Sequence, residues 1–146
     1  MTAYDGVEHE IALLLRRGRS WSRDIAAELH PGLSQTAYAL LARVNDLESI
    51  RASELCSYFG MDKGAMSRTI GELEQAGLLV RAPDPDDGRA QRLALSATGQ
   101  QRLAQARDVR CQTVRSRLAE WRPGDVETFA ALLARFNRQL EAEPTA

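Results

Sequence analysis

Apolar side chains recur every three or four positions over most of the chain, which is the spacing of an amphipathic helix. The sequence His30-Pro31-Gly32 interrupts the first such segment, and Ser34 then offers a good N-cap for the second. Pro123 suits the first position of the last segment, where a backbone N–H has no partner within the helix. Helices are therefore predicted over residues 4–29, 34–45, 52–59, 62–76, 97–121 and 123–140, with a very short strand at residue 50.

Residues 78–96 follow a different pattern. Two short apolar runs, at 78–80 and 93–95, enclose a polar tip at 83–90 that holds two Pro, three Asp, one Gly and one Arg. Apolar runs separated by turn residues predict a β-hairpin. We expect Gly88 to adopt a positive φ in the turn of this hairpin.

The hairpin needs a helix to lie on, because an isolated two-stranded hairpin is marginal in water. The predicted helix over residues 62–76 stands directly before it and is closed by Gly77. The helix, the glycine that ends it and the charged hairpin together predict a winged helix-turn-helix. The predicted fold is therefore mostly α, of the α+β class. We expect the rest of the chain to present this unit to DNA.

The helix over residues 62–76 has two distinct faces. Asp62 is its predicted N-cap, and Met66, Ile70 and Leu73 form an apolar stripe with the spacing i, i+4, i+7. Small side chains on the opposite face allow the helix to approach a partner closely, whereas the alternative interpretation is an ordinary solvated face. This opposite face consists of Gly64, Ser67, Arg68, Gly71 and Gln75.

Composition changes this picture only slightly. The 146 residues are 44% hydrophobic, enough for one domain or two closely merged ones, and the formal net charge is −1. Within residues 50–96, seven acidic side chains outnumber six basic ones, so DNA binding requires positive charge gathered on one face. This balance leaves open the alternative of a protein–protein adaptor that binds no DNA. The six basic side chains are Arg51, Lys63, Arg68, Arg81, Arg89 and Arg92.

The sequence lacks signatures of catalysis, metal binding and membrane insertion. It has no Gly-rich phosphate loop, zinc-finger spacing or nucleophile elbow, so we expect no enzyme activity, metal or cofactor. No apolar run approaches a length of about 18 residues, and the first ten residues lack the basic region of a signal peptide. Two cysteines, Cys56 and Cys111, form no disulfide framework, which favours a reducing cytoplasm.

Two strings give the chain a family resemblance. Residues 52–81 read ASELCSYFGMDKGAMSRTIGELEQAGLLVR, and residues 84–99 read DPDDGRAQRLALSATG. The second is the more specific, with the Asp-x-Arg of Asp87-Gly88-Arg89, a Leu-x-Leu-Ser strand and Gly99 early in the next helix. The chain thereby resembles the MarR family of bacterial transcription regulators over nearly its whole length. The resemblance implies a cytoplasmic homodimer, usually a repressor, that binds a pseudo-palindromic operator in double-stranded DNA.

The same resemblance implies roles for residues of the hairpin tip. Arg89 matches the arginine that enters the minor groove, where a guanidinium suits the enhanced negative potential of a narrow groove. Asp87 is expected to hold Arg89 in place by a salt bridge, because a carboxylate would otherwise repel phosphate. The alternative interpretation is that Asp84, Asp86 and Asp87 simply form a solvated turn.

In the helix over residues 62–76, the resemblance implies contacts in the major groove. Ser67 and Arg68 match contact positions, and Arg68 is suited either to reading a guanine or to clamping a phosphate. Lys63, near the start of the helix, is expected to contact phosphate. Gly64 departs from the Ser or Thr often found at its position in the family, which removes a hydroxyl contact.

The flanking helices are expected to hold two copies of the chain together. Residues 1–32 and 97–146 then form a helical dimerisation region around a DNA-binding domain at 33–96. The alternative is that these helices pack within one monomer. The apolar stripe that requires covering in the last helix comprises Val126, Phe129, Leu132, Leu133, Phe136 and Leu140.

The trigger of regulation has two candidates in the sequence. Trp21 and Tyr38 are expected to line a pocket for a small aromatic or anionic effector, although aromatic residues at helical spacing also suit a plain core. Cys111 lies in an Arg-rich stretch that could lower its pKa and make it redox-sensitive. Against this stands the simpler interpretation of both cysteines as small apolar filler.

Overall fold

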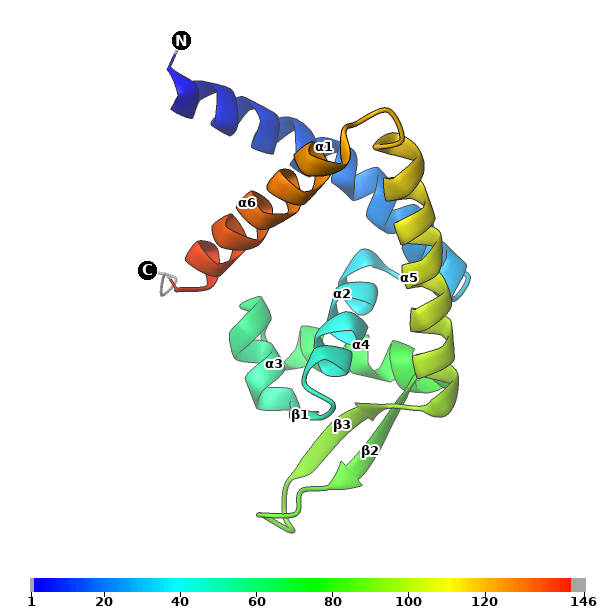
Figure 1. Ribbon diagram of the computed structural model, residues 1–146. Coiled ribbons are helices and arrows are strands. Elements are labelled where there is room, and N and C mark those ends of the chain that lie inside the picture. The colour runs from blue at the N-terminus through cyan, green and yellow to red at the C-terminus, as the bar shows by residue number, and fades with distance from the viewer. Residues whose placement is uncertain (1, 143–146) are drawn as a thin grey trace. The chain divides into compact units, whose positions relative to one another are not determined.

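A computed structural model describes residues 2–142 of the chain, and it is mostly helical with one small antiparallel sheet (Figure 1). The predicted fold class is therefore confirmed. By its internal contacts the chain divides into two compact units, with the boundary between Val109 and Arg110. The elements in chain order are α1 (Ala3–Leu29), α2 (Gln35–Asp46), β1 (Ile50–Arg51), α3 (Ala52–Phe59), α4 (Lys63–Gln75), β2 (Leu79–Pro83), β3 (Gln91–Leu95), α5 (Ala97–Arg117) and α6 (Pro123–Ala142).

Side chains at the helix starts explain why the helices begin where the sequence predicts. The oxygens of Ser34, Asp62 and Ser96 accept backbone N–H groups three residues onward at 3.1, 2.8 and 2.9 Å, which satisfies donors that have no partner within the helix. Pro123 begins α6, as expected. The end of α5 at Arg117 comes earlier than the predicted residue 121.

The sheet has the strand order β1-β3-β2, and both pairs are antiparallel. β2 and β3 form the predicted hairpin, which projects beyond the helices of its unit (Figure 1). Its pairing runs from Leu79 opposite Leu95 to Pro83 opposite Gln91, so the strands extend past the apolar runs. The loop at residues 84–90 joins them, and we call hairpin and loop together the wing.

The expectation that Gly88 adopts a positive φ is wrong. Among the described glycines, positive φ occurs at Gly32, Gly60 and Gly77. The wing loop turns instead through hydrogen bonds, since Asp84 N donates to Ala90 O at 3.0 Å. Because these bonds set the turn, the loop has no need of a left-handed residue.

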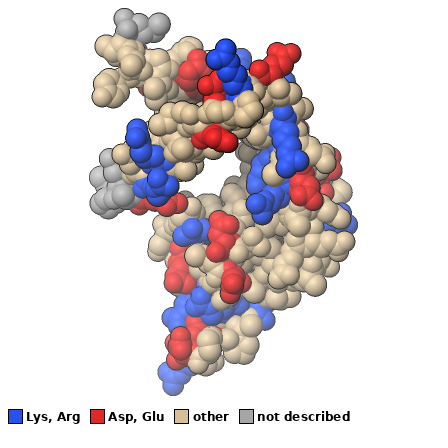
Figure 2. All heavy atoms as spheres, in the orientation of Figure 1, with Lys and Arg blue, Asp and Glu red and all other residues tan. Residues whose placement is uncertain are grey.

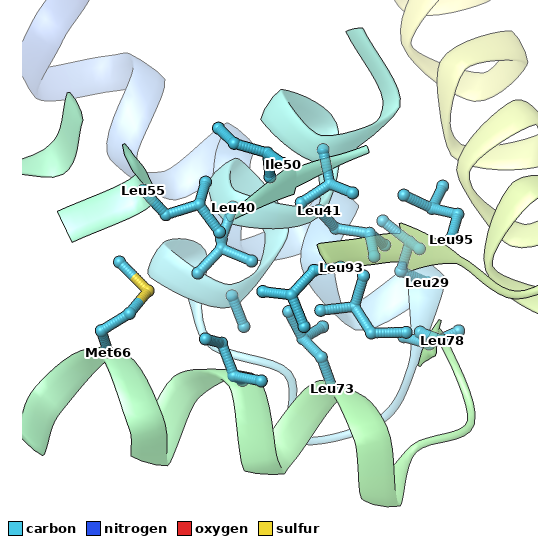
Figure 3. Close-up of a cluster of buried hydrophobic side chains, with 14 of the residues drawn as sticks. Leu29, Leu40, Leu41, Ile50, Leu55, Met66, Leu73, Leu78, Leu93 and Leu95 are labelled. Carbon is cyan, nitrogen blue, oxygen red and sulfur yellow. The ribbon is translucent and has the colours of Figure 1, made fainter. Parts of the chain in front are cut away.

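The hydrophobic core lies in the first unit, between α2, α4 and the sheet (Figure 3). Met66, Ile70 and Leu73 are buried as predicted, so their stripe fixes which face of α4 points outward. The core also takes in Leu29 from α1 and Ala106 from α5, which lie outside residues 33–96. Both flanking segments therefore contribute apolar surface to the interior that supports the wing.

The start of α5 fits closely against the chain that leaves α4. A Cβ added to Gly99 would stand 2.1 Å from Leu78 O, which is closer than atoms can approach without backbone movement. Ser96 N donates to the same carbonyl at 3.0 Å. Glycine at position 99 is therefore required by the close approach of two backbones.

The second unit has no comparable interior. None of the described side chains from 110 to 141 is buried, although the Trp121 and Phe129 rings lie 5.7 Å apart between centroids. Apart from the half-buried Val126, the predicted stripe of α6 is exposed in the single chain, with Leu132 at 50% and Leu140 at 59%. Within the part of the chain that the structure describes, no helix combines the length and apolar character that a membrane crossing requires.

Candidate nucleic-acid interface

The outward face of α4 is the first part of the candidate interface. With the apolar stripe buried, Gly64, Ser67 and Arg68 are exposed on the opposite side, and Lys63 is exposed at the first position of the helix. The hydroxyl of Thr69 is satisfied within the helix, since Thr69 Oγ1 donates to Ala65 O at 3.1 Å. The helix therefore offers a surface of small and polar groups flanked by two cations.

Gly64 leaves room at the N-terminus of this helix. A Cβ at this position would lie 3.3 Å from Asp62 Oδ1, the oxygen that accepts the backbone N–H of Ala65. Any side chain at this position would therefore be in tight contact with the capping carboxylate. Glycine at position 64 lacks the hydroxyl but leaves the N-cap undisturbed.

The wing loop is the second part of the interface, and its hydrogen bonds are short-range. Asp87 Oδ1 accepts the backbone N–H of Arg89 at 3.1 Å, and Ala90 N donates to Asp87 O at 2.9 Å. The expected side-chain salt bridge between Asp87 and Arg89 is not among the ion pairs of residues 2–142. Asp87 fixes the backbone at Arg89 instead, which leaves the guanidinium to point into solvent at an exposed position.

Asp84 departs from the interpretation of the three aspartates as a solvated turn. Its side chain has 0% exposure, and its Oδ2 lies 2.7 Å from Arg51 Nε and 3.4 Å from Arg92 Nη1. Its Oδ1 accepts the backbone N–H of Asp86 at 2.9 Å. A buried carboxylate needs such partners, because removing an unpaired charge from water is costly.

These contacts shift the pKa values of Asp84 and Arg51 in opposite directions. The hydrogen bond from Arg51, followed by that from the Asp86 backbone, holds the pKa of the Asp84 carboxyl far below its ordinary value of 3.8. Burial opposes this shift, and Arg92 adds to it. The same hydrogen bond with Asp84 raises the pKa of the Arg51 guanidinium. Asp84 therefore keeps its negative charge at lower pH than an ordinary aspartate does.

Arg92 extends the network to the start of β1. Its Nε donates to Ser49 Oγ at 2.9 Å, and its Nη2 donates to Ser49 O at 2.8 Å. A third ion pair joins the wing to α4, since Arg81 Nε lies 2.8 Å from Glu74 Oε1. The wing is thus tied by charged side chains to the strand on one side and to the helix on the other.

The structure separates the six basic side chains of residues 50–96 into two groups. Three have intramolecular ion pairs, and they are Arg51, Arg81 and Arg92. The other three are exposed and have no ion pair among the described residues, and they are Lys63, Arg68 and Arg89. Figure 2 shows acidic and basic side chains interspersed around the wing, so the face in this view has no continuous patch of one charge there.

The effector candidates do not line the cavity next to the turn after α1. Trp21 and Tyr38 are half-buried and pack against the core. A cavity of about 240 Å³ is lined by neither aromatic residue. It lies between the turn after α1 and the C-terminal half of α4, and its lining consists of His30, Pro31, Gly32, Leu33, Glu72, Gln75 and Ala76.

In residues 2–142, the cysteines and other metal-binding side chains form no cluster. Cys56 is half-buried and Cys111 is exposed, and both are free thiols. Among the described residues, no three His, Cys, Asp or Glu side chains come together in a way that could hold a metal ion.

Sequence reasoning missed the network around Asp84, although a signal for it exists. Residues on one face of a sheet are two apart along a strand, and Arg51 is the register partner of Arg92. An Asp and two Arg at such positions would indicate a cross-strand cluster once the register is known. Reasoning also missed that the Arg43 guanidinium lies 4.0 Å from the centroid of the Tyr58 ring.

Comparisons with known proteins agree on one relationship. Residues 32–90 match the model of the MarR family. The HTH-type transcriptional regulator YxaD of Bacillus subtilis is 29% identical over 132 residues, which are 90% of this chain and 91% of YxaD. The crystal structure of RV1404 from Mycobacterium tuberculosis has a TM-score of 0.80 at 19% identity, covering 100% of this chain and 99% of that chain. A mutant MarR from E. coli complexed with operator DNA has a TM-score of 0.62 at 20% identity, covering 93% and 99%.

Proposed function

We propose that this chain is a transcriptional regulator of the MarR family, and that it is a cytoplasmic homodimer that represses transcription by binding a pseudo-palindromic operator. The match of residues 32–90 to the family model and the 29% identity to YxaD support this proposal. A small aromatic or anionic molecule releases the operator by binding to the dimer. The solved neighbour that is complexed with operator DNA supports DNA as the partner of this chain as well. The two free thiols accord with a reducing compartment.

The observation that carries the proposal is the group of three exposed cations that have no ion pair with the described residues, Lys63, Arg68 and Arg89. A guanidinium or ammonium that has no partner in its own chain is available to phosphate or to a base edge. Arg68 and Ser67 on the outward face of α4 contact bases in the major groove, and Lys63 contacts phosphate. Arg89 enters the minor groove, with Asp87 fixing its backbone.

The exposed apolar stripe of α6 supports the homodimer. Soluble monomers rarely expose a contiguous apolar patch of this size, so a second copy is its natural cover. We therefore retain residues 1–32 and 97–146 as the dimerisation region and 33–96 as the DNA-binding domain. The two-fold axis of the dimer matches an operator with half-sites about 10–10.5 bp apart.

Ligand binding, rather than oxidation, is the proposed trigger. Trp21 and Tyr38 offer aromatic surface that is only partly buried, which suits an aromatic effector. Oxidation of the exposed Cys111 is the alternative trigger. Replacing both cysteines by Ser should leave induction in cells intact, whereas loss of induction with the fold preserved would favour redox sensing.

Selection of bound sequences from a random duplex pool tests the proposal. We expect the full-length protein to enrich an inverted repeat, and Arg89→Ala to weaken binding of that repeat in fluorescence anisotropy while circular dichroism stays unchanged. Absence of any enriched sequence would favour a protein–protein adaptor. Unchanged affinity of Arg89→Ala would contradict the assignment of the wing.

A further inference from the structure

Three charged side chains, two from the wing and one from β1, meet on one face of the sheet because of its register. Arg51 of β1 is opposite Arg92 of β3, and Arg92 is opposite Ala82 of β2. Asp84 lies two residues beyond Ala82, so its side chain emerges on the same face. Strands β1 and β3 and the first residue of the wing loop thus contribute one charge each to a single cluster, which we call the wing clamp (Arg51, Asp84 and Arg92).

The geometry of the wing clamp places the carboxylate at its centre. Asp84 Oδ2 contacts both guanidinium groups, at 2.7 Å for Arg51 Nε and 3.4 Å for Arg92 Nη1. Arg51 is 33 residues away along the chain, so this contact links the wing loop to β1, which is distant in sequence. Arg92 is itself held by two hydrogen bonds to Ser49. The first residue of the wing loop is thereby attached to the body of the unit.

We propose that Asp84 is a positioning residue for DNA binding, which holds the wing loop so that Arg89 reaches the minor groove in a defined place. The proposal rests on the proposed function, because it assumes that Arg89 contacts DNA. Asp84 itself does not touch DNA in this account, since its side chain is fully buried. It acts by keeping the loop that carries Arg89 from sampling other positions, which would cost entropy on binding.

Electrostatics alone predicts the opposite effect of losing this carboxylate. Near phosphate, removal of a negative charge strengthens binding, because repulsion disappears and the salt-dependent attraction grows. If Asp84 positions the wing, its neutralisation weakens binding instead. Asp86 is the matched control, because it carries the same charge two residues away, is exposed, and has no side-chain ion pair among the described residues.

The experiment measures operator affinity of full-length Asp84→Asn and Asp86→Asn by fluorescence anisotropy, on the sequence enriched by the wild type. We expect Asp84→Asn to weaken binding about 5- to 10-fold, and Asp86→Asn to leave it unchanged or tighter. Circular dichroism and thermal melting establish that both variants are folded. Equal behaviour of the two variants would overturn the proposal.

A double-mutant cycle with Arg89→Ala separates positioning from general damage to the fold. If Asp84 acts through Arg89, Asp84→Asn should have no further weakening effect in the Arg89→Ala background, measured at low salt where weak binding stays measurable. The same loss in both backgrounds would show a merely structural role and overturn the proposal. Should Asp84→Asn fail to fold, Arg51→Gln removes the same 2.7 Å contact and provides the cycle. An Arg89→Ala variant with wild-type affinity would instead contradict the proposed function itself.

Discussion

The two compact units contain similar apolar stripes but place them in different surroundings. In the first unit, Leu40 and Leu73 are 0% exposed because α2, α4 and the sheet face one another. In the second, Leu132 and Leu140 of α6 remain about half exposed at 50% and 59%, and no described side chain from 110 to 141 is buried. An amphipathic helix thus specifies a face that needs covering, while the cover itself comes from other elements.

This difference indicates separate roles for the two regions. The first unit has its own hydrophobic core, against which α4 and the strands of the wing pack. For the stripe of α6, we propose the equivalent surface of a second copy as the cover. The predictions below test that division, beginning with the largest expected effect.

Charge placed on the α6 stripe should abolish the dimer. Leu132→Glu together with Phe136→Glu puts two carboxylates where a fully buried Leu or Phe contributes about 1.5–3 kcal/mol each. We expect a monomer or an unfolded chain, and loss of operator binding in either case, measured by light scattering behind a sizing column and by anisotropy.

The control for this variant adds the same charges to the other side of the helix. On a helical wheel, Ala131 and Ala134 lie opposite the stripe, so Ala131→Glu with Ala134→Glu should leave the dimer intact. A wild-type protein that runs as a stable monomer at micromolar concentration, with sharp operator specificity, would refute the dimer proposal.

Truncation of one leucine in each unit should affect different equilibria. Leu40→Ala should lower the free energy of unfolding by about 2–5 kcal/mol, because it leaves a cavity in a packed interior. Leu140→Ala should mainly raise the dimer dissociation constant, so its melting temperature should fall most at low protein concentration. Denaturant and thermal melts over a range of protein concentrations compare the two variants. An equal dependence on protein concentration in both would argue against separate roles for the two units.

Gly99→Ala tests whether the start of α5 belongs to the first unit. The added methyl group would stand 2.1 Å from Leu78 O, so we expect a loss of about 1–3 kcal/mol from overpacking. Gly71→Ala is the matched control, since a Cβ there meets nothing within 4 Å and alanine favours the helix by about 0.5–1 kcal/mol. Denaturant melts that show the two variants to be equally stable would contradict the close fit.

The smallest expected effect is the acid sensitivity of the wing clamp. The pKa of Asp84 is lowered on folding, so its stabilising contribution is fully present above its unfolded value near 3.8 and is lost as the pH falls through the lower folded value. The difference in free energy of unfolding between wild type and Asp84→Asn should therefore be largest near neutral pH. Urea melts at pH 6 and pH 3 should show it shrinking, and Arg51→Gln should show the same trend. A difference that stays constant with pH would disprove the linkage.

Several features of this protein could be predicted from neighbouring residues alone. The helix starts at Ser34, Asp62, Ser96 and Pro123 follow from groups that act on backbone atoms within three residues. The stripe of α4 follows from the helical period, and the hairpin follows from two apolar runs around turn residues. Each of these signals is local, because the residues that produce it lie close together in the sequence.

Of the two features that the sequence analysis missed, one depends on hydrogen bonds within the wing loop and the other on residues far apart in the chain. A positive φ is predicted for Gly88 because it is a glycine. Backbone hydrogen bonds that involve Asp84 and Asp87 form the turn without one. Asp84 looked like one of three equivalent aspartates until the strand register brought Arg51, 33 residues away, within 2.7 Å.

Packing also sets which of the basic side chains form ion pairs. Six basic side chains between residues 50 and 96 are chemically similar, and the sequence specifies only their number and spacing. Strand register and helix packing then brought acidic partners to Arg51, Arg81 and Arg92, and left Lys63, Arg68 and Arg89 without an ion pair in the described chain. The physical reason is that an ion pair forms only between atoms a few ångströms apart, and packing sets those distances for residues remote in sequence.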